Sequence, residues 1–237
     1  MLMQTSTPTL TRRPAVPRIS PDAGSRPGSQ KGAHTGELVD QMDLMGAPMA
    51  FARNAEIYGE NEPAGYVYKV VSGTVRTYKI FDDGRRQIGA FYFPGDVFGL
   101  ELGAEHQFSA EAIDKCVILV VKRSALVALA ERDGNTARRL WSFTAGELSR
   151  VQKHMLLLTK SAEERVAWFL LEMAGRLATV EAVELPMSRQ DIADYLGLTI
   201  ETVSRTLTHL EARATIALPT ARRIVLRNRK ALDRLDA

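Results

Sequence analysis

The sequence predicts an α+β protein made of an antiparallel β-roll, a long helix and a winged helix-turn-helix domain. Short β-prone runs separated by glycine and proline occupy residues 50–122, and an apolar heptad pattern follows in 135–159. Two short amphipathic helices joined by a glycine turn are predicted in 187–212. We divide the chain into a tail, a β-roll domain, a dimerisation helix and a helix-turn-helix domain, at residues 1–36, 37–133, 134–159 and 160–237.

Residues 1–36 differ in composition from the rest of the chain. They hold five of the ten prolines and five Lys or Arg against one acid, so we expect a disordered basic tail that either touches phosphates or is only solvated. The whole chain is 45% apolar, enough for real cores, but it has no run of membrane-spanning length. With a single cysteine and no secretory apolar region at the N-terminus, the protein is expected in the cytoplasm, without a membrane partner.

The segment from residue 50 to 122 has the pattern of an antiparallel double-sheet barrel. Asp82-Asp83-Gly84 is predicted to be a hairpin turn between two of its strands. Cys116 stands in a β-branched run, which indicates a buried small side chain, and a reactive thiol is the alternative. The runs expected to be strands are 66–71, 74–80, 87–93 and 116–121.

Residues 135–159 are predicted to form one long helix with an apolar seam. Two rows of side chains repeat every seven residues, which is the a/d pattern of a coiled coil with charged residues beside it. We expect this seam to join two copies of the chain in parallel, while the alternative is a helix that packs only on its own barrel. The seam consists of Trp141, Thr144, Leu148, Val151, Met155 and Leu158.

The stretch 187–212 is predicted to hold two crossed helices. Ser188 and Thr199 are expected to cap the first and second helix, and Gly197 takes the turn between them, because glycine adopts a positive φ at little cost. The apolar face of the second helix consists of Val203, Leu207 and Leu210, and its opposite face consists of Ile200, Glu201, Ser204, Arg205 and Thr208.

Glu201, Ser204 and Arg205 form one patch near the start of the second helix, because residues three and four apart are neighbours. That part of a recognition helix meets DNA base edges, where Arg suits guanine O6/N7 and Glu accepts from cytosine N4. A solvated face with an i,i+4 Glu–Arg pair is the alternative. A hairpin is predicted at 215–226, which makes the domain a winged helix, and six Lys or Arg without an acid between 212 and 232 indicate a phosphate-binding surface.

The run RQDIADYLGLT at 189–199, followed by ETVSR at 201–205, resembles the DNA-reading segment of the cyclic AMP receptor/fumarate-nitrate regulator superfamily. Its Glu-x-x-Ser-Arg form is that of the fumarate-nitrate branch, and the chain looks closer to the FixK-type regulators of that branch. The runs VVSGTVR at 70–76 and FPGDVFGLE at 93–101 are similar to the cyclic-nucleotide-binding β-roll of the same superfamily. The resemblance covers roughly residues 45–230.

The resemblance implies a homodimeric, sequence-specific transcription regulator, mainly an activator, that binds double-stranded DNA and recruits RNA polymerase. It also implies control of genes for low-oxygen respiration or nitrogen metabolism, with no chemistry performed by the protein. The acidic turn 82–84 could contact the polymerase, although such residues are usually just turn formers. A cupin-type enzyme is a distant alternative, because its metal ligands would be clustered and the four histidines, His34, His106, His154 and His209, are scattered.

The resemblance also bears on ligands. In the nucleotide-binding members a glutamate holds the ribose and an Arg-Ser pair holds the cyclic phosphate. Glu101 matches the glutamate, or is a loop carboxylate, but Phe108-Ser109 stands where Arg-Ser is expected, and an apolar ring cannot neutralise a phosphate. We therefore expect no cyclic nucleotide, and no iron–sulfur cluster, because the tail lacks the cysteines that bind one in the fumarate-nitrate regulators. The alternative function is a regulator whose β-roll binds a cyclic nucleotide or another small effector.

The resemblance further implies which bases are read. Where Ile200 stands, the cyclic AMP receptor has an arginine that reads a guanine, whereas isoleucine can only pack on a thymine methyl. Arg205 is expected to hold the guanine of a TTG core, Glu201 to accept from a base amino group, and Ser204 to lie beside a thymine. Two-fold symmetry then predicts a palindrome of the TTGAT–N4–ATCAA type. Phosphate contacts are expected from Arg189, Gln190, Thr199, Thr202 and Arg222.

Overall fold

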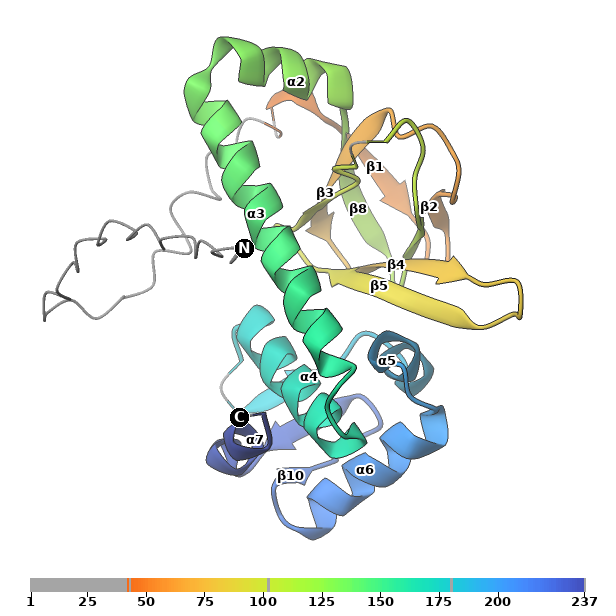
Figure 1. The fold of residues 1–237 in the computed structure, drawn as a ribbon, viewed down its shortest axis with the longest axis vertical. Coiled ribbons are helices and arrows are strands. Elements are labelled where there is room, and N and C mark those ends of the chain that lie inside the picture. The colour runs from red at the N-terminus through yellow and green to blue at the C-terminus, as the bar shows by residue number, and fades with distance from the viewer. Residues whose placement is uncertain (1–41, 43, 102, 180, 237) are drawn as a thin grey trace, which may run out of the picture.

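The computed structural model describes residues 42, 44–101, 103–179 and 181–236, and the predicted tail lies outside these residues. The first part is a roll of two four-stranded sheets, with strand orders β1-β8-β3-β6 and β2-β7-β4-β5 and antiparallel pairing throughout (Figure 1). The predicted antiparallel β-roll is therefore confirmed. Its strands are β1 (Ala47–Phe51), β2 (Glu56–Tyr58), β3 (Tyr66–Ser72), β4 (Val75–Ile80), β5 (Arg86–Tyr92), β6 (Val97–Phe98), β7 (Ser109–Ala112) and β8 (Cys116–Lys122).

The two sheets of the roll enclose an apolar core. Cys116 is fully buried in it, as predicted, and its Sγ donates to the backbone oxygen of Thr74 at 3.2 Å. Desolvation raises the pKa of the Cys116 thiol to about 11. Gly73 has φ +83°, and a Cβ there would lie 2.6 Å from both Cys116 Sγ and the Lys115 oxygen, so the turn requires glycine. Further core side chains are Tyr58, Val70, Val75, Phe98 and Ile118.

Two helices follow the roll, α2 (Arg123–Arg132) and α3 (Gly134–Leu157). Leu126 of α2 is buried against the outer face of the first sheet, with Leu140 and Phe143 of α3 packed on the same cluster. Asp133 caps α3, since its carboxylate accepts hydrogen bonds from the backbone amides of Asn135 and Thr136, at 3.1 Å each. Figure 1 shows α3 running past the roll and ending beside the C-terminal domain.

The C-terminal domain packs helices against a small sheet of order β10-β11-β9, in which β10 and β11 form the predicted wing hairpin. Its last helix, α7, was not predicted. Asn228 begins this helix by accepting from the Ala231 amide at 3.1 Å, and Leu232 is fully buried. The elements are α4 (Ala162–Arg176), β9 (Ala182–Glu184), α5 (Arg189–Leu196), α6 (Ile200–Ala212), β10 (Ile216–Ala217), β11 (Arg223–Leu226) and α7 (Arg229–Asp236).

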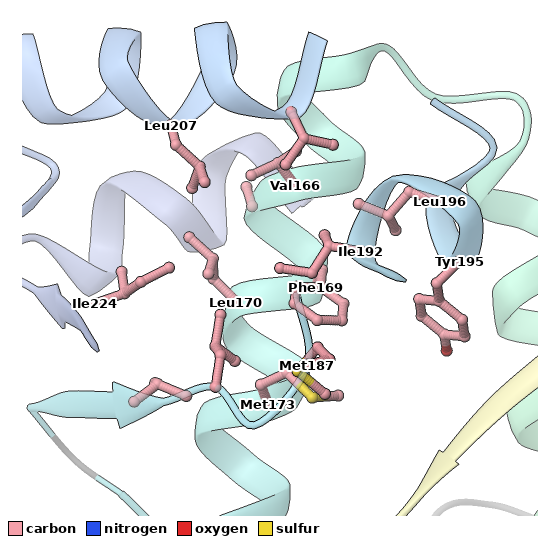
Figure 2. Packing of buried hydrophobic residues seen from close by; sticks show 14 of the residues in the cluster. Val166, Phe169, Leu170, Met173, Met187, Ile192, Tyr195, Leu196, Leu207 and Ile224 are labelled. Atoms are coloured by element: carbon pink, nitrogen blue, oxygen red, sulfur yellow. The ribbon is translucent and has the colours of Figure 1, made fainter. Parts of the chain in front are cut away.

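One apolar cluster joins the C-terminal domain to the roll. Figure 2 shows its centre, where Phe169 of α4 lies beside Ile192 of α5. Phe91 of β5 belongs to the same cluster, with its ring 5.2 Å from the ring of Tyr195 on α5. The position of α5 is therefore set by α4 on one side and by the roll on the other.

Candidate nucleic-acid interface

Helices α5 and α6 form the helix-turn-helix, and local hydrogen bonds define where each begins. Ser188 Oγ accepts from the Asp191 amide at 3.1 Å and Asp191 Oδ2 accepts from the Ser188 amide at 2.9 Å, which is a capping box. Gly197 ends α5 at φ +64°, and Thr199 caps α6 by accepting from the Thr202 amide at 3.2 Å. The predicted caps and turn are confirmed.

Helix α6 buries one side in the domain core and leaves the other side open. Each of the three side chains on its predicted apolar face is at most 2% exposed. On the opposite face Glu201 and Arg205 are exposed and Ser204 is half-buried. Ile200 departs from the expectation of an outward-facing residue, because it is half-buried and packs against the core. Only part of its side chain is left to meet a ligand.

The two charged side chains of this face are available to a ligand. In the described part of the chain, no ion pair joins Glu201 to Arg205. The pKa of the Glu201 carboxyl lies below its usual range, because the carboxylate accepts from its own backbone amide and from the Thr199 hydroxyl at the start of the helix. At neutral pH the face therefore presents an ionised acceptor beside a permanent donor, the two kinds of group that distinguish bases in the major groove.

Some of the residues expected to bind phosphates already have hydrogen-bond partners within the protein. The exposed Gln190 donates from Nε2 to the carboxylate one turn further along α5, at 2.6 Å. Thr199 Oγ1 and Thr202 Oγ1 lie 3.1 Å apart and share a hydrogen bond. Arg189 is half-buried near the start of α5, and Arg222 is exposed in the wing turn. The expected phosphate contacts thus lie on α5, at the start of α6 and in the wing turn.

Helix α3 presents a row of apolar side chains to solvent. Trp141 is 76% exposed and Val151 is 60% exposed, although both are large apolar residues. A single folded chain rarely exposes a long apolar strip, so this row indicates a surface that another protein covers. All six residues of the predicted seam are exposed: Trp141, Thr144, Leu148, Val151, Met155 and Leu158.

The region of the roll that matches a nucleotide site is occupied by the protein's own contacts. Glu101 Oε2 lies 2.9 Å from His106 Nδ1, and the fully buried His106 stacks on Tyr58 with ring centroids 3.6 Å apart. Phe108 packs on Gly89, where an added Cβ would lie 3.1 Å from its ring. From the sequence, His106 was predicted to be a histidine alone in a loop. Its position five residues after Glu101 was the signal that could have suggested the Glu101–His106 pair.

Ser109, the residue after Phe108, is engaged as well, because its Oγ accepts from the Glu60 amide at 2.9 Å. The matching pair therefore offers a phosphate no cation. Within the described ranges, no group of three or more His, Cys, Asp or Glu side chains could hold a metal ion. None of the described helices is both long enough and apolar enough to span a bilayer.

Models of two protein families match the chain. The model of the Crp-like helix-turn-helix domain matches residues 164–235, and that of the cyclic nucleotide-binding domain matches residues 48–133. The nitrogen fixation regulation protein FixK of Azorhizobium caulinodans is 55% identical over 199 residues, which are 81% of this chain and 80% of that protein. The chain belongs to the FixK type of the cyclic AMP receptor/fumarate-nitrate regulator superfamily.

Other FixK proteins agree with this membership. FixK of Rhizobium meliloti is 42% identical over 181 residues, which are 76% of this chain and 82% of that protein. The structure of FixK2 from Bradyrhizobium japonicum has a TM-score of 0.79 and 56% identity, and the match covers 82% of this chain and 98% of that chain. The resemblance drawn from residues 189–205 is confirmed. This FixK-type chain is a transcription regulator with a DNA-binding helix-turn-helix domain.

Proposed function

We propose that this FixK-type chain binds a palindromic DNA site as a homodimer and activates transcription of genes for nitrogen fixation or low-oxygen respiration by recruiting RNA polymerase. The supporting observation is the open face of α6, where Glu201 and Arg205 stand exposed on a helix whose opposite face is buried in the domain core. The relatives named FixK support the gene class. The protein performs no chemistry, acts in the cytoplasm and needs neither a membrane nor a cofactor.

Each half-site is read by the first two turns of α6 in the major groove. Arg205 donates two hydrogen bonds to the guanine of a TTG core, Glu201 accepts from a base amino group, and Ser204 lies beside a thymine. Ile200 reaches a thymine methyl with the part of its side chain that the core leaves uncovered. Phosphates are held by the residues expected to contact them, which fix the register of the helix without reading bases: Arg189, Gln190, Thr199, Thr202 and Arg222.

The second copy is held by the apolar row of α3. Pairing two rows in parallel removes Trp141, Val151 and their neighbours from water, and it places two copies of α6 on the same side of the dimer. Two-fold symmetry then requires a palindrome of the TTGAT–N4–ATCAA type, with half-site centres about one helical turn apart. The exposed row supports the dimer because it has no other occupant within the described residues.

A second candidate is a regulator switched by a cyclic nucleotide, and the match of residues 48–133 to the nucleotide-binding model favours it. The contacts of Glu101, Phe108 and Ser109 within the roll weigh against it. Titration with cyclic AMP during a DNA-binding assay decides between the two, because only the second candidate needs the nucleotide for high affinity.

The experiment that tests the proposed function is selection of bound DNA from a random pool at a stated salt concentration. The purified protein, with no added nucleotide, metal or cluster, should enrich palindromes with a TTG core in each half. Enrichment of single half-sites only would contradict the dimer, and enrichment without a TTG core would contradict the roles given to the α6 residues.

A further inference from the structure

Two arginines of the roll hold the first helix of the helix-turn-helix by its acidic face. Arg76 of β4 donates from Nη1 to Asp191 Oδ1 at 2.7 Å, and Arg86 of β5 donates from Nη2 to the same oxygen at 2.7 Å. Arg86 also donates from Nε to Asp194 Oδ2 at 2.7 Å. We call these four residues the α5 clamp.

The α5 clamp is made of charges that are largely removed from water. The side chain of Asp191 is 4% exposed, that of Asp194 11% and that of Arg86 24%. Arg76 is fixed within the roll, because its Nη2 pairs with Glu111 Oε1 at 2.8 Å. Charges this deeply buried are costly unless each keeps its partner, so the roll and α5 hold one geometry in preference to others.

The same carboxylates connect the α5 clamp to the DNA-binding face. Asp191 uses its second oxygen to cap α5, and Asp194 uses its second oxygen to accept from Gln190, one of the expected phosphate contacts. Helices α5 and α6 share the core of the domain, so a fixed α5 also fixes the direction of α6. The backbone link from α3 to the domain is short, at residues 158–161, and would by itself allow the domain to turn.

We infer that Arg76 and Arg86, which lie outside the DNA-binding domain, determine which spacing between half-sites the protein accepts. The inference rests on the proposed dimer. In that dimer each roll packs on α3 through Leu140 and Phe143, and the α5 clamp acts together with the Phe91–Tyr195 contact to attach each recognition helix to its roll. The distance between the two recognition helices is thereby fixed. A protein without the clamp still reads the same bases, but it tolerates half-sites that are moved apart or together.

The test compares palindromes that differ only in spacer length, N3, N4 and N5, at one salt concentration. The unmodified protein should prefer one spacer strongly. In Arg86→Gln the ratio of affinities between the preferred and the other spacers should fall by about tenfold, within the usual range of coupling between distant sites. Asp194→Asn, on the other side of the same pair, should lower the ratio as well. The double variant Arg86→Asp with Asp194→Arg, which exchanges the two charges, should restore part of the preference for one spacer.

Arg85→Gln is the matched control, because it removes the same charge from the neighbouring residue, whose ion pair is with Asp83 at the exposed hairpin. It should keep the spacer preference of the unmodified protein. If Arg86→Gln weakens binding to all spacers by one factor, or if Arg85→Gln lowers the ratio equally, the α5 clamp does not set spacing. An unmodified protein that binds single half-sites as well as any palindrome would overturn the proposed dimer itself, and the inference with it.

Discussion

Replacing Arg205 by alanine should lower DNA affinity while leaving the stability of the protein almost unchanged. Arg205 is exposed, and no hydrogen bond or ion pair of its side chain is found within the described residues. Its removal should therefore change the free energy of unfolding by less than about 0.5 kcal/mol. A two-hydrogen-bond contact with guanine contributes about 1–3 kcal/mol of discrimination, and a dimer makes the contact twice, so a full palindrome should lose roughly 2–6 kcal/mol.

The assay is a fluorescence anisotropy titration with two DNA duplexes, the TTGAT–N4–ATCAA palindrome and a copy in which the guanine of each half-site is replaced. The unmodified protein should distinguish the two, whereas Arg205→Ala should bind them almost equally. Arg132→Ala is a suitable control, since it removes the same charge from an exposed position at the end of α2. If Arg205→Ala weakens both duplexes by the same factor, Arg205 contacts a phosphate and the base assignment is wrong.

Four further experiments test other parts of the molecule: two substitutions, the addition of a nucleotide and the alkylation of a thiol. Val151→Asp should place an unpaired carboxylate in the α3 seam and split the dimer by light scattering, while Gln152→Asp beside it should not; an intact Val151→Asp dimer would refute the seam. Arg189→Ala should weaken all DNA sequences alike and lower the salt slope by about one, and a change confined to one base position would contradict its phosphate role. Cyclic AMP should leave DNA affinity unchanged, and a rise in affinity would show that Phe108 does not exclude the nucleotide. At pH 8 the Cys116 thiol of the folded protein, with a pKa of about 11, should resist alkylation, and rapid labelling would disprove its burial.

Features that depend on neighbouring residues were predictable from the sequence. The caps at Ser188 and Thr199 and the turn at Gly197 each use hydrogen bonds or backbone angles within a few residues, so their residue types are sufficient signals. The β-roll followed from its repeated turn residues, and the exposed α3 row from its seven-residue period. The roles of the α6 residues toward DNA remain predictions, because they depend on a partner molecule.

Features that join distant parts of the chain were not predictable. Arg86 lies 105 residues from Asp191 in sequence, and neither residue has a local pattern that points to the other. Ile200 was assigned wholly to the open face because helical spacing gives only a direction, whereas its burial depends on what α6 packs against. Helix α7 was missed because its charged residues outnumber its apolar ones. The available signal was Asn228, a residue type that often caps helices, four residues before Leu232, which is buried.

The apolar cluster that continues from the C-terminal domain into the roll makes each half of the molecule dependent on the other for burial. Ile88 and Phe91 of β5 are covered by residues that come after the long helix, and Tyr195 is covered in part by the roll. Cutting the chain between α3 and α4 would leave two pieces, each with an aromatic surface newly exposed to water. The intact chain should instead melt in one cooperative transition, in which the recognition helix and the sheet that supports it are lost together.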